Sequence, residues 1–160
     1  MRLTHFTNYA LRMLQYAALR DGEVSRVADI AQIHRASVHH MIKVANMLGR
    51  AGYLKTLRGR SGGIRLAKPA HEITVGEIVR ITEAPLELAE CFNAESNTCP
   101  LIGICNLSRT WHRALAAFLE VLDGVTVADL AANRGELMER LMLPPDFDPD
   151  DGPDAIPDPV

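Results

Sequence analysis

Residues 25–66 read SRVADIAQIHRASVHHMIKVANMLGRAGYLKTLRGRSGGIRL, and this stretch contains the signals for one complete folding unit. Apolar residues recur at helical spacing in two blocks separated by a tight break, which predicts two short helices capped by Ser25 and Ser37. Strand patterns follow at residues 53–57 and 64–66, and glycines between them permit the positive φ angles of a hairpin loop. Helix, turn, helix and hairpin in this order predict a winged helix-turn-helix.

Further helices are expected on both sides of this unit. Thr4 can cap a helix over about residues 8–19, and Thr74 can cap another that leads out of the winged unit. The longest helical pattern covers residues 107–122, and Thr126 starts a shorter one. The expected fold is therefore mainly α-helical, with a small β-hairpin wing and one long helix towards the C-terminal end.

The chain divides into four expected regions along its length. The last region holds six aspartates, many prolines and no Lys or Arg, and we expect it to be disordered. The regions are a winged helix-turn-helix domain over residues 1–83, a cysteine loop over 84–106, the long helix and C-terminal helices over 107–143, and an acidic tail over 144–160.

The distribution of charge indicates a nucleic-acid partner, although the formal net charge of the 160 residues is -3. Residues 1–80 carry 13 basic and five acidic side chains, a local net charge of +8, and such local excess is the better guide to a polyanionic partner. No apolar run approaches the length needed to cross a bilayer, and the start of the chain lacks the apolar stretch of a signal peptide. We expect a cytoplasmic protein with no membrane partner.

Polar and basic side chains lie where a winged helix-turn-helix would meet double-stranded DNA. The expected second helix of the motif offers hydrogen-bonding side chains for base edges, and the glycine-rich loop offers cations for the phosphate backbone. The alternative is that these side chains form an ordinary solvated face. No catalytic constellation or phosphate-binding enzyme loop is present in the sequence, so we expect no enzyme. The candidate DNA-binding residues are Arg35, Ser37, His39, His40, Lys43, Arg58, Arg60, Ser61 and Arg65.

All three cysteines of the chain, Cys91, Cys99 and Cys105, fall within fifteen positions. An odd number of thiols cannot close into disulfide pairs, and three soft ligands on one loop could hold iron or zinc. Two interpretations stay open from the residues alone. The loop could carry a metal that regulates the DNA-binding unit, or it could be a zinc-binding structural or interaction module.

Several separated segments resemble one group of bacterial winged-helix regulators, the group that includes NsrR, RirA and IscR. The resemblance covers essentially residues 1–143. It is carried by the opening MRLT and FTNYALR, by GRAGY at 49–53 and by RGRSGGIRL at 58–66. The spacing of the cysteines, with CPLI at 99–102, and DG-x-T-x-ADL at 123–130 continue it.

This resemblance implies a homodimeric repressor of operator DNA whose long helix crosses the partner subunit. It further implies an iron–sulfur cluster on Cys91, Cys99 and Cys105, of the 4Fe–4S type in preference to 2Fe–2S. In NsrR-like members the cluster senses nitric oxide, whereas in RirA-like members a fragile cluster reports iron supply. The cysteine loop of IscR-like members is spaced differently.

The chain departs from the NsrR-like pattern at Asn8. NsrR-like members with a known fourth ligand take it from an aspartate of the opposite subunit, at the position that Asn8 occupies here. A carboxamide is neutral and is a poorer iron ligand than a carboxylate. Either Asn8 of the partner binds weakly, or water, a small thiol or another side chain completes the site. Both signals, nitric oxide and iron status, therefore stay open.

Overall fold

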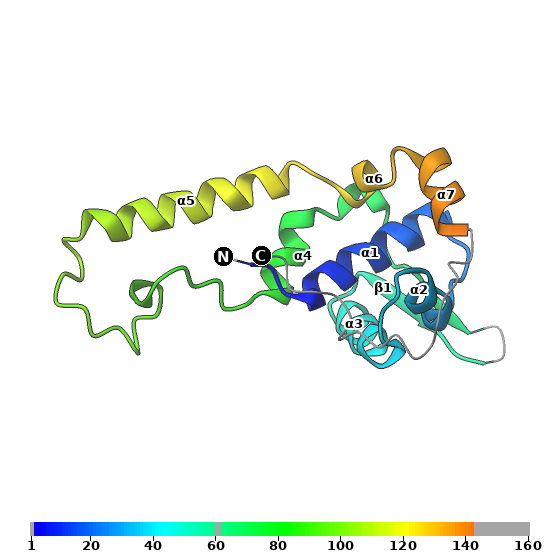
Figure 1. The fold of residues 1–160 in the computed structure, drawn as a ribbon, viewed down its shortest axis with the longest axis horizontal. Coiled ribbons are helices and arrows are strands. Elements are labelled where there is room, and N and C mark those ends of the chain that lie inside the picture. The colour runs from blue at the N-terminus through cyan, green and yellow to red at the C-terminus, as the bar shows by residue number, and fades with distance from the viewer. Residues whose placement is uncertain (1, 60–61, 143–160) are drawn as a thin grey trace.

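The computed structural model describes residues 2–59 and 62–142, and it confirms the expected mainly helical fold with one antiparallel hairpin (Figure 1). Arg60, Ser61, and the acidic tail over 144–160 lie outside the described residues. The elements are α1 (His5–Leu19), α2 (Val27–Ile33), α3 (Val38–Arg50), β1 (Leu54–Leu57), β2 (Gly63–Leu66), the 3-10 turn η1 (Ala70–Glu72), α4 (Val75–Thr82), the 3-10 turn η2 (Glu90–Phe92), α5 (Asn106–Asp123), α6 (Val127–Leu130) and α7 (Arg134–Met142).

Helices α2 and α3 form the helix-turn-helix, and a left-handed residue makes the turn between them. Arg35 adopts φ 49°, which reverses the chain and buries Ala36 against the core. Ser37 occupies the N-cap position of α3 as expected, but its side chain makes no capping hydrogen bond in the described part of the chain.

The prediction that Ser25 caps the preceding helix is wrong. Arg26 is the N-cap residue of α2, and Ser25 is instead buried in an antiparallel bridge to Ile64 of the hairpin. The Ser25 N–H donates to the Ile64 carbonyl at 2.9 Å, and the Ile64 N–H donates back at 2.8 Å. A Cβ on Gly63 would lie 2.3 Å from the Ser25 carbonyl oxygen, so this close pairing requires glycine. The bridge joins the wing to the start of the helix-turn-helix.

Helix α1 is the centre of the winged unit and packs against α3, α4 and α6. Thr4 caps it, with its Oγ1 accepting from the Thr7 N–H, so the helix begins at His5, three residues before the predicted start. The core around it consists of fully buried aliphatic side chains from every neighbouring element. They include Met13, Leu14, Ile30, Met41, Leu48, Ile64, Ile73, Ile78 and Val127.

Glu83 ties the beginning of α1 to the end of α4. Its Oε1 accepts hydrogen bonds from the Thr4 N–H at 2.7 Å, from the Thr4 hydroxyl at 2.9 Å and, over a shorter distance, from the buried Thr7 hydroxyl. Burial acts to raise the pKa of Glu83, but these hydrogen bonds outweigh it and hold the pKa below its ordinary value. The carboxylate is therefore charged at neutral pH and links the two helices by hydrogen bonds.

Helix α5 projects away from the winged unit (Figure 1). None of its 18 residues, all of them described, is buried. Leu107, Trp111 and Val121 are exposed by 59%, 40% and 70%. Such a run of exposed large apolar side chains on one helix is unusual for an isolated subunit. No helix within the described ranges is both long and apolar enough to span a bilayer.

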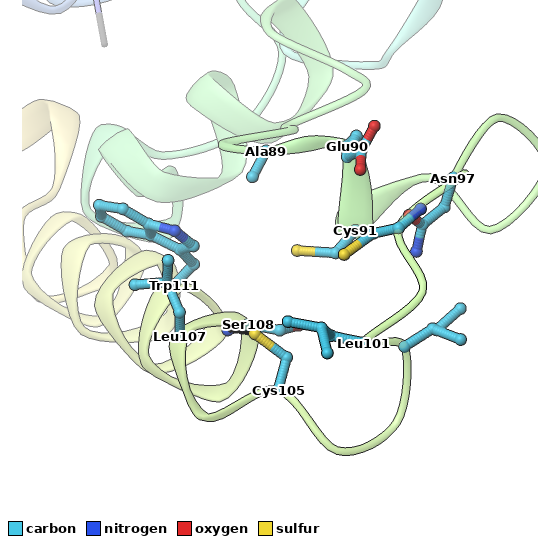
Figure 2. A pocket seen from close by; sticks show the side chains of 11 residues that line it. Ala89, Glu90, Cys91, Asn97, Leu101, Cys105, Leu107, Ser108 and Trp111 are labelled. Carbon is cyan, nitrogen blue, oxygen red and sulfur yellow. Dashed lines mark hydrogen bonds between the residues drawn. The ribbon is translucent and has the colours of Figure 1, made fainter.

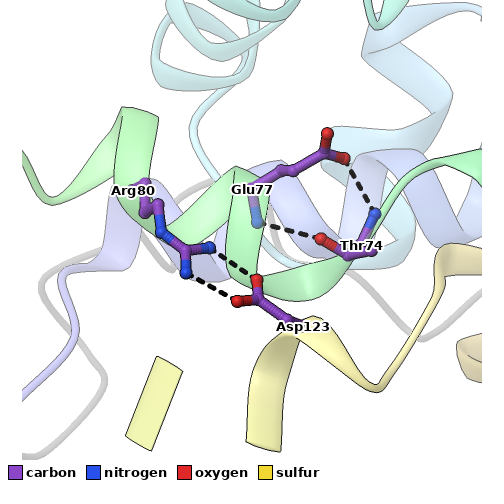
Figure 3. Close-up of polar contacts among 4 residues, drawn as sticks. All are labelled: Thr74, Glu77, Arg80 and Asp123. Carbon is purple, nitrogen blue, oxygen red and sulfur yellow. Dashed lines mark hydrogen bonds and ion pairs between the residues drawn. The ribbon is translucent and has the colours of Figure 1, made fainter. Parts of the chain in front are cut away.

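The far end of α5 is joined to α4 by an ion pair (Figure 3). Backbone pairing next to this ion pair adds to the connection. The Arg80 guanidinium donates to both carboxylate oxygens of Asp123, at 2.5 and 2.6 Å. A Cβ on Gly76 would lie 1.9 Å from Asp123 Oδ1, so glycine makes room for the pair. Thr74 and Thr126, both confirmed as helix caps with complete capping boxes, pair as an antiparallel bridge at the same junction.

Candidate metal centre and nucleic-acid interface

The three cysteines line one cavity between the cysteine loop and the first turns of α5. The cavity measures about 180 Å³, and most of its wall is apolar. Figure 2 shows Cys91 and Cys105 on opposite sides of it, and all three thiols are free and half-buried. The remaining wall is formed by Ala89, Glu90, Asn97, Leu101, Ile102, Leu107, Ser108 and Trp111. The fold thus brings together the three residues that the sequence singled out.

The donor set suits a thiophilic metal centre in its chemistry. Thiolate sulfur is the ligand that iron–sulfur clusters and zinc prefer. Across the described ranges no three Cys, His, Asp or Glu side chains already lie at the separations of a single bound metal ion.

Cys105 occupies the N-cap position of α5, where its sulfur is already paired with the helix backbone. The Ser108 N–H donates to Cys105 Sγ at 3.4 Å. Unsatisfied N–H groups and the positive end of the helix dipole favour a negatively charged ligand at this position. A thiolate at residue 105 would therefore link a bound metal directly to the long helix.

An aromatic contact joins the first cysteine to the same helix. Phe92, next to Cys91 in η2, stacks on the His112 ring with centroids 4.1 Å apart and an interplanar angle of 3°. His112 lies in the second turn of α5, and its Nδ1 is 2.8 Å from the Ser108 carbonyl oxygen, which fixes the ring against its own helix. The stack sets the position of Cys91 relative to α5.

Asn97 and Trp111 are lining residues that the sequence analysis did not select. Asn97 is half-buried, and its Oδ1 accepts from the Cys99 N–H at 2.9 Å, a local turn that the Asn-x-Cys spacing could have indicated. Trp111 reaches the cavity only because α5 begins at Asn106 and returns along the loop. Asn8 is exposed on α1 and is not one of the described residues that line this cavity.

The described members of the expected DNA-binding set lie in the turn before α3, on α3 and on the hairpin. Arg35, His39, His40, Lys43, Arg58 and Arg65 are exposed, and Ser37 is half-buried. Lys43 is three residues after His40 and four after His39, so the three share one helix face. Met41, Val44, Ala45 and Leu48 form the opposite, buried face of α3.

Lys55 is a further basic residue of this surface that the sequence analysis did not select. The hairpin register places Lys55 directly opposite Arg65. Like charges in directly opposed positions destabilise a hairpin, and an external anion such as a phosphate would relieve the repulsion. Only the register could reveal this pair, because ten residues separate the two in the chain.

His34 lies in the turn that precedes the recognition surface and differs from the exposed histidines of α3. Burial lowers the pKa of His34 to about 4, with the positive charge of Arg12 acting in the same direction. Its Nε2 is buried and has no hydrogen-bond partner within the described residues. His34 is therefore neutral at pH 7 and packs as part of the turn.

Comparison with known proteins agrees with the fold. The sequence profile of the Rrf2 family, described as an iron-dependent transcriptional regulator, matches residues 3–133. The HTH-type transcriptional regulator NsrR of Shouchella clausii is 49% identical over 144 residues, which cover 89% of this chain and 97% of that protein. The protein of the same name from Halalkalibacterium halodurans is 47% identical over 146 residues, covering 91% and 100%.

A solved structure supports the same assignment. CymR, the global cysteine regulator of Bacillus subtilis, superposes with a TM-score of 0.68 at 29% identity, covering 82% of this chain and 97% of that one. The profile match, the relatives and the winged helix-turn-helix architecture all agree, and the chain belongs to the Rrf2 family of transcriptional regulators.

Proposed function

We propose that this chain is a homodimeric repressor whose affinity for operator DNA is gated by an iron–sulfur cluster, of the 4Fe–4S type, that senses nitric oxide. The observation that carries the proposal is the convergence of Cys91, Cys99 and Cys105 on one cavity at the start of α5. The similarity of this chain to NsrR regulators and the iron dependence in the family description are consistent with it.

Ligation by the three thiolates would fix the free end of α5. Cys105 is the N-cap residue of that helix, and Phe92 next to Cys91 stacks on His112 of the helix, so drawing the two sulfurs together orders the loop on α5. When bound, the cluster supplies iron that nitric oxide can attack and whose loss frees the thiolates. The far end of α5 is already held by the Arg80–Asp123 pair.

A continuous series of packed helices connects α5 to the DNA-reading surface. Helix α5 packs on α4, α4 packs on α1, and α1 packs on α3. In the proposed dimer, the exposed apolar side chains of α5 bury against the partner, so the orientation of α5 sets the separation of the two α3 helices. Winged and helix-turn-helix dimers require that separation to match successive major-groove faces, about one helical turn apart.

An iron-responsive repressor is the second candidate function, and Asn8 favours it. Without a carboxylate at residue 8, a cluster on three thiolates has one weakly held iron. Such a centre should lose iron readily when supply falls. Nitric oxide and iron depletion are therefore the two signals to compare.

The decisive experiment is anaerobic purification followed by metal and sulfide analysis. We expect a coloured protein with iron and inorganic sulfide, and Cys99→Ser should lose both. Thr98→Ser, in the same loop, is the matched control and should retain them. A colourless wild-type protein with stoichiometric zinc would instead establish a structural metal site and refute the cluster.

The regulatory part of the proposal is tested by titrating the holoprotein with nitric oxide and, separately, with an iron chelator. Affinity is followed on a duplex selected by the holoprotein from genomic fragments. Arg65→Ala should weaken binding and reduce the dependence of log K on log salt by about one unit, since each phosphate contact contributes about that much. Arg140→Ala, in the exposed part of α7, is the control. Equal salt dependence of the two variants would show that Arg65 of the wing does not contact a phosphate.

A further inference from the structure

The two polar atoms of the Asn97 side-chain amide differ in their hydrogen bonding. Its Oδ1 accepts from the Cys99 N–H at 2.9 Å and closes a turn around the second cysteine. Its Nδ2 is buried, and no hydrogen-bond partner for it exists among the described residues. Asn97 lines the same cavity as the three thiols, and Figure 2 shows it on the side of Cys91, across from Cys105.

A buried amide N–H without an acceptor is rare in native proteins, because it loses its hydrogen bonds to water and gains none in return. The bond to Cys99 fixes the amide plane and so prevents Nδ2 from turning out to solvent. Most of the cavity wall offers no acceptor, since it is built from Leu101, Ile102, Leu107 and Trp111. Glu90 and Ser108 offer side-chain oxygens there, but neither accepts a hydrogen bond from Asn97 Nδ2.

The other side-chain acceptors that line the cavity are the cysteine sulfurs. Sulfur in a thiolate or in an iron–sulfur centre is negatively charged and accepts hydrogen bonds from amide N–H groups, which alter the reduction potential and the stability of the centre. Cys105 already has such a donor in the Ser108 N–H. The N–H groups of Asn97 Nδ2, by contrast, have no acceptor among the described residues.

We propose that Asn97 is a positioning residue of the metal centre, whose Nδ2 donates a hydrogen bond to a sulfur atom of the iron–sulfur site while its Oδ1 holds the backbone of Cys99. This inference rests on the proposed cluster and adds a residue that is not a ligand. The donor stabilises negative charge on sulfur, so it slows the loss of iron and raises the reduction potential.

One substitution separates the donor of the Asn97 amide from its acceptor, and a second serves as its control. Asn97→Asp keeps an oxygen that can accept from the Cys99 N–H, but it replaces the donor with a negative charge that faces the sulfurs. Asn93→Asp is the matched control, because Asn93 makes the same kind of turn in the same loop. Its Oδ1 accepts from the N–H groups of Glu95 and Ser96, at 3.0 and 3.3 Å, and it is not a described lining residue of the cavity.

The measurement is the rate of iron loss to a chelator from the full-length, anaerobically purified holoprotein, together with its reduction potential. Asn97→Asp should lose iron about ten-fold faster than wild type, the size expected for one hydrogen bond to a charged group, and its potential should be lower. Asn93→Asp should remain within about two-fold of wild type, because Asn93 does not line the cavity that holds the thiols.

The outcomes separate the two levels of the proposal. Wild-type kinetics and potential in iron-loaded Asn97→Asp would overturn the role of Asn97 alone, as would an equal effect of Asn93→Asp. Absence of iron and sulfide from wild type would refute the cluster and, with it, this inference. If Asn97→Asp fails to acquire iron, Asn97→Ala against Asn93→Ala takes its place, and equal rates for that pair would also overturn the proposal.

Discussion

Removing the carboxylate of Glu83 should detach the start of α1 from the end of α4. Three donors converge on Glu83 Oε1 in the folded chain: the Thr4 N–H, the Thr4 hydroxyl and the Thr7 hydroxyl. Glu83→Ala deletes the acceptor of all three.

The size of the effect follows from the burial of each donor. Hydrogen bonds to charged groups contribute about 1.5–3 kcal/mol each, but Thr4 is exposed and water can take over its two bonds. Thr7 is fully buried, and its hydroxyl keeps Thr82 Oγ1 as a partner at 2.7 Å. The net loss is therefore close to that of one such bond, about 1–2 kcal/mol of unfolding free energy.

Urea unfolding followed by far-UV circular dichroism at pH 7 measures this loss, with all proteins at one protomer concentration. Glu87→Ala is the control, because it removes an exposed carboxylate four residues further along the chain. We expect Glu87→Ala to match wild type within about 0.5 kcal/mol. Equal stabilities of Glu83→Ala and Glu87→Ala would show that the hydrogen bonds to Glu83 contribute nothing to the unfolding free energy.

The same difference should depend on pH in a defined direction. The pKa of Glu83 is lower in the folded chain than its ordinary value of 4.5, so its contribution is complete above that value. The contribution is then lost as the pH falls through the folded pKa, because the protonated carboxyl no longer accepts as an anion. A wild-type advantage over Glu83→Ala that grows on acidification would contradict this reasoning.

Three further predictions concern other parts of the winged unit. Because the pKa of His34 falls from 6.5 to about 4 on folding, the unfolded chain binds a proton that the folded chain excludes between those values. As the pH falls from about 6.5 to about 4, wild type should lose unfolding free energy in urea titrations more steeply than His34→Gln. Parallel curves for the two proteins would disprove this prediction. Met41→Ala should cost about 2–5 kcal/mol because the side chain is fully buried in α3, whereas Ile42→Ala, at a position exposed by 44%, should cost at most about 1 kcal/mol in the same assay. Gly76→Ala would place a Cβ 1.9 Å from Asp123 Oδ1 and should lower the thermal midpoint in wild type but not in an Asp123→Ala background, so additive shifts would argue against a clash with that carboxylate.

Local signals predicted most of the winged unit correctly. Thr74 and Thr126 cap helices as expected, since a capping box depends on hydrogen bonds across only three residues. The hairpin also forms where its strand patterns and glycines indicated. Each of these features depends on residues close together in the chain, so a single sequence contains the information needed.

Ser25 shows where local reasoning failed. Its side chain suits a helix N-cap, but the backbone of Ser25 pairs with Ile64, a residue 39 positions away, and that pairing shifts the cap to Arg26. Two backbone hydrogen bonds in a buried position outweigh one exposed capping bond. Which of these competing bonds forms depends on where the wing folds back, which no local pattern specifies.

The candidate metal centre also combines features that the sequence predicts with features that only the folded structure shows. The residue types alone identified the thiol donors, because three cysteines within fifteen positions are a chemical signal that needs no coordinates. The cavity they line, the buried Nδ2 of Asn97 and the cross-strand position of Lys55 depend on contacts between segments that the chain keeps apart. Composition and short-range spacing thus specify which atoms are available, whereas the packing of distant elements specifies which of those atoms meet, because only folding excludes water and brings their partners within bonding distance.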